Sequence, residues 1–139
     1  MKHAANPEPV FDTLLAYQRS AALAGAIELD LFTAIGAGAR RPAELARRLE
    51  ATERGVRSLC DYLVTLDFLT KSGEDYGLTP VSATFLDRES PRCIASISSF
   101  LNSPGLARAF EDVAACVRRG GTVMGERGTS APETPVWVE

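Results

Sequence analysis

The segment from Leu31 to Leu86 constrains the fold more than any other part of the sequence. Two short amphipathic helices are predicted over residues 42–49 and 53–66, followed by a hairpin with strands near 68–71 and 76–79. A helix-turn-helix followed by a hairpin is the element order of a winged helix. Such a module either binds DNA or serves as a packing and dimerisation module, so the function depends on which use applies.

The helix-turn-helix pair has clear local signals. Pro42 suits the first turn of a helix, where its missing N–H costs nothing. Thr52 is predicted to cap the second helix, and Glu53 suits the positive helix end. The residues predicted to point inward are Leu45, Ala46, Leu49, Val56, Leu59, Cys60, Leu63 and Leu66.

Further helices are predicted on both sides of this core. One helix spans residues 9–28, and a short one spans 29–35. Small residues fill the second half of the first helix. They indicate either close packing against another helix or simply the high helix propensity of alanine. Three Ser-Pro or Thr-Pro pairs predict later helix starts at Thr79-Pro80, Ser90-Pro91 and Ser103-Pro104, the last helix stopping at Gly120-Gly121.

These elements predict a mainly α fold, namely a winged helix with a small β-hairpin and extra N- and C-terminal helices. We expect a flexible N-terminus over 1–8 and one winged-helix domain over 9–120, with its winged-helix core at 31–86. Residues 121–139 are predicted to be a linker. The total of 139 residues suffices for one ordinary domain.

Composition narrows the possible classes. Apolar residues make up 45% of the chain, and the net charge is −3. A nucleic-acid-binding domain usually has a basic excess. No apolar run approaches the ~20 residues that cross a bilayer, and the N-terminus carries no secretion signal. We therefore expect a cytoplasmic protein without a membrane partner.

The charge of the winged-helix core argues against DNA binding. Residues 31–86 hold seven Lys or Arg and seven Asp or Glu, and the hairpin tip carries Glu74 and Asp75. Phosphate contacts supply most of non-specific DNA affinity. Arg54 and Arg57 on the second helix suit either a solvated face or base readout. A DNA-binding transcription regulator therefore stays as the alternative, and a scaffold or ligand-binding module as a third option.

No set of residues predicts catalysis or metal binding. The three cysteines, Cys60, Cys93 and Cys116, are widely spaced and suit buried thiols, and the single histidine, His3, suits an ordinary surface side chain. The sequence has no phosphate-binding glycine loop and no assembly for nucleophilic catalysis. We predict no catalytic, cofactor-binding or metal-binding residue in this chain.

Three blocks of sequence together resemble one family. They are AALAGAIELDLFTAIG over residues 21–36, the block over 41–86 that opens RPAELARRLEATERGVRSLCDYLVTLDFLT, and GTSAPETPVWVE over 128–139. This arrangement resembles the N-terminal winged-helix dimerisation domain of the S-adenosylmethionine-dependent small-molecule O-methyltransferases of bacteria and plants.

The resemblance implies a function that this chain performs as part of a larger enzyme. In the family, the first helices interleave with a second subunit, so a homodimer is expected. A further Rossmann-like domain of ~200 residues binds the methyl donor, and the chain is expected to be a fragment that lacks it. On this resemblance, residues 9–120 are the dimerisation domain, and residues 121–139 are a linker toward the missing methyltransferase domain. The complete enzyme would transfer a methyl group from S-adenosylmethionine to a hydroxyl of a small, aromatic acceptor. The fragment is expected to bind no cofactor and to be inactive alone.

The same resemblance suggests four acceptor-binding residues. Leu101 and Asn102 match a segment that family members place against the acceptor, and Phe110 matches an aromatic position of the same cavity. The alternative is that Leu101 and Phe110 are core residues and that Asn102 caps a helix in the left-handed conformation. Tyr17 is either supplied to the partner's pocket or is an ordinary interface aromatic.

Overall fold

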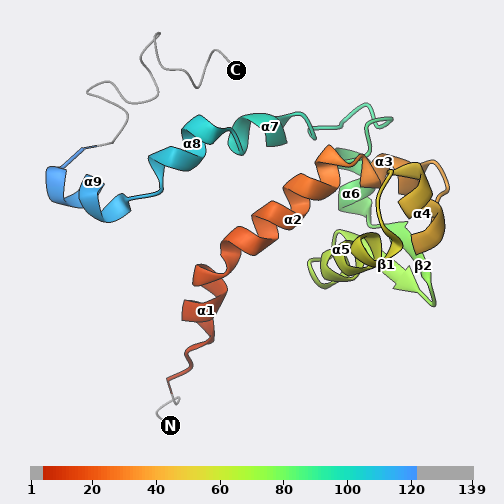
Figure 1. The fold of residues 1–139 in the computed structure, drawn as a ribbon, viewed down its shortest axis with the longest axis horizontal. Helices are drawn as coiled ribbons and strands as arrows, with labels where there is room; N and C mark the ends of the chain where they lie inside the picture. Colours follow the sequence, from red (N-terminus) through yellow and green to blue (C-terminus); the bar gives the residue numbers. More distant parts are fainter. Residues whose placement is uncertain (1–4, 122–139) are drawn as a thin grey trace. The chain divides into compact units, whose positions relative to one another are not determined.

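The computed structural model describes residues 5–121, in two compact units that divide between Ala95 and Ser96. Figure 1 shows the order of the elements. The first unit contains α1 (Glu8–Leu14), α2 (Ala16–Glu28), α3 (Leu31–Gly36), α4 (Pro42–Arg48), α5 (Glu53–Thr65), β1 (Leu69–Ser72), β2 (Asp75–Leu78) and α6 (Pro80–Phe85). The second contains α7 (Ile97–Leu101), α8 (Pro104–Ala109) and α9 (Val113–Arg119). The predicted mainly α, winged-helix-like class is confirmed.

The helix-turn-helix pair forms as its local signals predict. Helix α4 begins at Pro42, and α5 begins after Thr52, whose hydroxyl accepts a hydrogen bond from the Gly55 N–H at 3.2 Å. This cap satisfies one of the free amide groups at the helix start. The two helices pack against each other, and α5 packs against β1.

The hairpin is tighter than the predicted four-residue spacer. Strands β1 and β2 are antiparallel, with Leu69 opposite Leu78 and Ser72 opposite Asp75, so only Gly73 and Glu74 form the turn. Gly73 has φ 61°, which glycine adopts without steric cost. The Tyr76 N–H also donates to the Arg40 carbonyl at 2.9 Å, which fixes the hairpin against the α3–α4 loop.

One hydrophobic core lies in the first unit, beneath α2–α5 and the hairpin. Its buried members include the inward residues predicted at positions 45, 46, 56, 60 and 63, and α3 adds Leu31, Phe32, Ala34 and Ile35. Leu49, Leu59 and Leu66 are only partly buried, and they pack against this core from its edge. The predicted helix faces are therefore confirmed.

The single first helix predicted over 9–28 is wrong, because the structure interrupts it at Leu15. The Thr13 hydroxyl donates to the Pro9 carbonyl at 2.8 Å, a bond that competes with regular helix geometry and bends helices. Helix α3 also begins later than predicted, since Asp30 before it has φ 58°.

Two of the three Ser-Pro or Thr-Pro signals begin helices. Thr79 and Ser82 form a reciprocal capping box at the start of α6. Pro104 begins α8, although the Ser103 hydroxyl makes no cap bond. Ser90-Pro91 begins no helix, because the Ser90 hydroxyl donates to the Thr84 carbonyl at 2.6 Å and so ties this loop back to α6.

The last predicted helix also breaks in two, after Ala109. The Asp112 carboxylate accepts from the Ala115 N–H at 2.9 Å and so starts α9 anew. Gly120, with φ 74°, ends α9 where the sequence predicted a stop. The proposed linker over 121–139 lies almost wholly outside the described residues and stays a prediction.

The three cysteines are free thiols in different surroundings. Only Cys60 is buried, whereas Cys93 and Cys116 are partly exposed, so the prediction of three buried thiols is wrong for two of them. Burial raises the pKa of the Cys60 thiol to about 12.

Thiol labelling should reflect this difference. At pH 8 we expect a small disulfide reagent to modify Cys93 and Cys116 readily and Cys60 only after denaturation, because the thiolate is the reactive form. Mass spectrometry of the labelled peptides checks this order. Equal labelling of Cys60 in the native chain would contradict the core described above.

Candidate functional site

The start of the first unit presents an apolar surface. From α1 through the interruption at Leu15 to the first turn of α2, five large apolar side chains are 45–67% exposed. They are Val10, Phe11, Leu14, Leu15 and Tyr17. We name this set the arm surface. Large exposed apolar surfaces mark interaction sites in soluble proteins.

The second half of α2 is anchored in its own unit. Ala26 is fully buried, and Leu23 and Ile27 pack against the core. Gly25 has open space around it, since a Cβ built there would meet no atom within 4 Å. Packing among the described residues therefore explains part of the small-residue stripe but gives no reason for a glycine at position 25.

The hairpin tip neutralises the arginines beside it. The Arg57 guanidinium lies 3.1 Å from Glu53 and 3.4 Å from Glu74, and Arg41 lies 3.1 Å from Asp75. The hydrogen bond that Arg57 donates to the Glu53 carboxylate is the main reason why the pKa of Arg57 is raised. Arg57, a candidate for base readout, is thus already paired with carboxylates of its own module.

A second polar cluster ties the hairpin to α5. One carboxylate oxygen of Asp61 accepts from the Lys71 ammonium and from the Tyr76 hydroxyl, both at 2.6 Å. These two hydrogen bonds, the one from Lys71 first, lower the pKa of Asp61. The Lys71 nitrogen also lies 5.2 Å from the centre of the Tyr76 ring. The cluster therefore has a structural role in holding the hairpin.

The acceptor-binding candidates of the second unit are exposed. Leu101 ends α7 and is 58% exposed, and Phe110 follows α8 and is 74% exposed. The alternative that they are core residues is therefore wrong for the described chain. Tyr17, 67% exposed, belongs to the first unit.

Asn102 follows α7 as its cap, but with φ −103° rather than in the left-handed conformation. Its side-chain amide donates to the Ser98 carbonyl at 2.9 Å and to the Ser98 hydroxyl at 3.3 Å. The side chain is therefore tethered to the last turn of α7. The neighbouring Ser103 hydroxyl is buried and has no hydrogen-bond partner among the described residues, a feature that the sequence did not predict.

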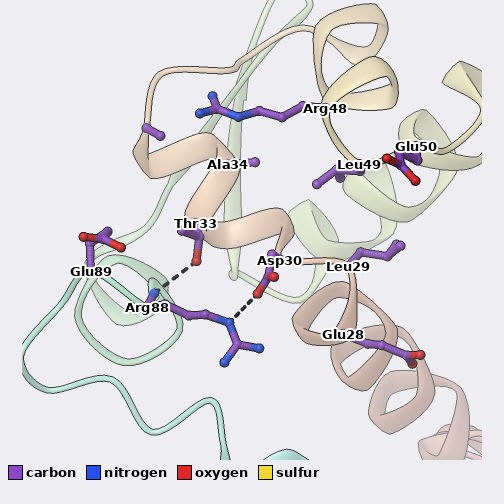
Figure 2. Close-up of a pocket in the computed structure, with 11 residues that line it drawn as sticks. Glu28, Leu29, Asp30, Thr33, Ala34, Arg48, Leu49, Glu50, Arg88 and Glu89 are labelled. Carbon is purple, nitrogen blue, oxygen red and sulfur yellow. Dashed lines mark hydrogen bonds and ion pairs between the residues drawn. The ribbon is translucent and has the colours of Figure 1, made fainter.

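A pocket of about 460 Å³ lies in the first unit, where the α2–α3 junction meets the end of α4 and the loop after α6 (Figure 2). The Arg88 side chain pairs with Asp30, and the Arg88 N–H donates to the Thr33 hydroxyl at 3.1 Å. The remaining lining residues are Glu28, Leu29, Ala34, Ala37, Arg48, Leu49, Glu50 and Glu89. None of the four predicted acceptor-binding residues lines it, and no sequence motif pointed to it.

The described residues hold no group of three or more potential metal ligands and no helix suited to crossing a membrane.

Similarity to known proteins identifies the family to which the chain belongs. The model of the O-methyltransferase dimerisation domain matches residues 11–88, more than half of the chain. The chain belongs to this family.

Individual relatives agree with this assignment. The tetracenomycin polyketide synthesis 8-O-methyl transferase TcmO of Streptomyces glaucescens is 37% identical over 90 residues, which cover 64% of this chain and 26% of TcmO. A Nostoc punctiforme structure described as an O-methyltransferase is 47% identical, with a TM-score of 0.90 over 97% of this chain and 41% of that one. Human N-acetylserotonin methyltransferase, solved with S-adenosylmethionine, is 25% identical, with a TM-score of 0.72 over 86% of this chain and 36% of that one.

This dimerisation domain thus spans about a quarter of the curated relative and about two fifths of the most similar of these two structures. The match begins at residue 11 and so includes most of the arm surface. Dimerisation is the role named for the family, and S-adenosylmethionine is bound by one of the relatives.

Proposed function

We propose that this dimerisation domain pairs two subunits of an S-adenosylmethionine-dependent O-methyltransferase and covers its acceptor site. The observation that carries the proposal is the arm surface, an exposed apolar surface inside the matched family segment. Burying such side chains against a second copy removes apolar area from water, which is the main driving force of association. The homodimer follows from self-complementary pairing of the same surface.

Leu14→Asp should test the dimer directly. Leu14 is 66% exposed and lies outside the core, so the fold should survive the change. Full burial of a leucine contributes about 1.5–3 kcal/mol, so we expect the dimer dissociation constant to rise at least tenfold. Sedimentation equilibrium measures the constant, and circular dichroism confirms the helix content.

Val81→Asp on α6 is the matched control, because Val81 is also more than half exposed but lies outside the arm surface. It should leave the dissociation constant unchanged. A wild-type chain that stays monomeric at high micromolar concentration would overturn the proposed dimer.

For the acceptor site, we infer that Leu101, Asn102 and Phe110 contact the acceptor and that Tyr17 is supplied by the partner subunit. The two exposed apolar side chains suit an aromatic ring, and the tethered Asn102 offers its amide oxygen to a hydroxyl. The relatives' names support a small aromatic acceptor, since N-acetylserotonin carries an aromatic hydroxyl.

Asn102→Ala in the complete enzyme should separate acceptor binding from donor binding. Losing one hydrogen bond of about 0.5–1.5 kcal/mol should raise the KM for the acceptor up to about tenfold and leave the KM for S-adenosylmethionine unchanged. Ser99→Ala, on the neighbouring α7, is the control. An unchanged acceptor KM in the Asn102 variant would remove this residue from the site.

Arg57 and Arg41 are paired with carboxylates at the hairpin tip, which argues against DNA binding by this face of the described residues. Three statements stay predictions: the cytoplasmic location, the domain limits at 9–120 and the absence of donor binding by this chain.

A further inference from the structure

The interruption between α1 and α2 contains an unusual long-range hydrogen bond. In a continuous helix the Asp12 carbonyl would accept from the N–H four residues later. Helix α1 instead ends at Leu14, and the Gln18 N–H donates to the Leu15 carbonyl, only three residues back. The Arg19 guanidinium reaches back over seven residues and donates to the Asp12 carbonyl at 2.6 Å.

Arg19 thereby spans the interruption from one helix to the other. Its side chain starts in the first turn of α2, and its acceptor is a backbone atom of α1. Because the acceptor belongs to the backbone, the bond restrains the direction of α1 rather than one side chain. Charged donors make stronger hydrogen bonds than neutral ones.

The residues around the interruption are exposed, so little else restrains α1. Among its residues none is buried, and the core begins only further along α2. The Thr13 hydroxyl, bonded to the Pro9 carbonyl, favours the bend but lies within α1 and does not cross to α2. Among the described residues, the Arg19 bond is thus the side-chain hydrogen bond that joins the two helices across the bend.

We propose that Arg19 is a positioning residue that sets the angle of the α1 arm and so presents the arm surface to a second copy of this chain. This proposal rests on the homodimer proposed above. Val10, Phe11 and Leu14 lie on the α1 side of the bend and Tyr17 on the α2 side, so the angle decides whether they form one surface. A preset angle lowers the entropy lost on association.

The test is Arg19→Met, which keeps a long unbranched side chain and removes the donor. Residual dipolar couplings, measured by NMR on the whole chain, report the orientation of α1 relative to α2. We expect the α1 couplings of the variant to shrink relative to those of α2, the Asp12 carbonyl carbon to shift, and amide exchange in α1 to speed up about two- to tenfold. Gln18→Met is the matched control and should leave the α1 couplings unchanged. Arg19→Lys keeps a charged donor, so its α1 couplings should lie between those of Arg19→Met and those of the wild type.

Sedimentation of the same variants tests the link to the dimer, and we expect a weaker dimer for Arg19→Met alone. Unchanged α1 couplings in Arg19→Met would overturn the positioning role. Altered couplings with an unchanged dissociation constant would overturn its connection to the dimer. A monomeric wild type with the expected couplings would instead count against the proposed dimer and leave the restraint on α1 intact.

Discussion

Replacing Leu63 with alanine is expected to lower the free energy of unfolding of the first unit by about 2–5 kcal/mol. Leu63 is fully buried in α5, where the core brings together residues of α3, α4 and β1. The truncation removes apolar contacts and leaves a cavity that a packed core closes only in part. Urea unfolding followed by circular dichroism measures the change.

Val81→Ala provides the comparison, because Val81 on α6 is 53% exposed. This substitution should lower the free energy of unfolding by no more than about 0.5 kcal/mol, the usual range for exposed positions that make no cap, buried contact or ion-pair network. A loss below about 1 kcal/mol for Leu63→Ala would mean that the helix phase of α5 differs from the one described here.

Replacing Tyr76 with alanine should cost about as much as other aromatic truncations, about 3–5 kcal/mol. The ring is 1% exposed in the core, and the hydroxyl donates to Asp61. Tyr76→Phe keeps the ring and loses only this hydrogen bond, so it should cost about 1 kcal/mol. The same urea experiment compares both variants, and equal losses would show that the hydroxyl rather than the ring stabilises the hairpin.

The Asp61 cluster also predicts a pH dependence. The pKa of Asp61 is lowered in the folded chain from its ordinary value of 3.8, so folding favours its ionised form. This stabilisation is present at neutral pH and is lost as the pH falls below 3.8 through the lower folded-state pKa. Tyr76→Phe removes one cause of the lowered pKa and should therefore show a smaller loss of stability on acidification.

Local signals predicted much of the first unit correctly. Pro42, Thr52 and the Thr79-Pro80 pair begin helices where expected, because each acts through its own backbone or within one turn. The inward faces of α4 and α5 follow from helical periodicity alone. The same kind of reasoning failed at Leu15 and Ser90, where a side-chain hydroxyl bonds a backbone carbonyl that the pattern does not reveal.

The candidate sites were less predictable than the fold. The four acceptor-binding candidates came from resemblance, and the structure contributes only their exposure and the tether of Asn102. The pocket around Arg88 could not be predicted, because it joins segments 58 residues apart in the chain. The hydrogen bond from Arg19 to Asp12 could not be predicted either, because it depends on a bend that helical periodicity does not reveal.

By itself the sequence determined the helix-turn-helix and hairpin order, the apolar faces of its helices and the absence of a net basic charge, because these depend on neighbouring residues and on composition. Only the tertiary structure decided where the charges go. Arg41 meets Asp75 and Arg57 meets Glu74 because the hairpin folds back beside α4 and α5. Likewise, the chain is long enough to bury one core, yet only packing showed that α1 stays outside it and keeps its apolar side chains exposed.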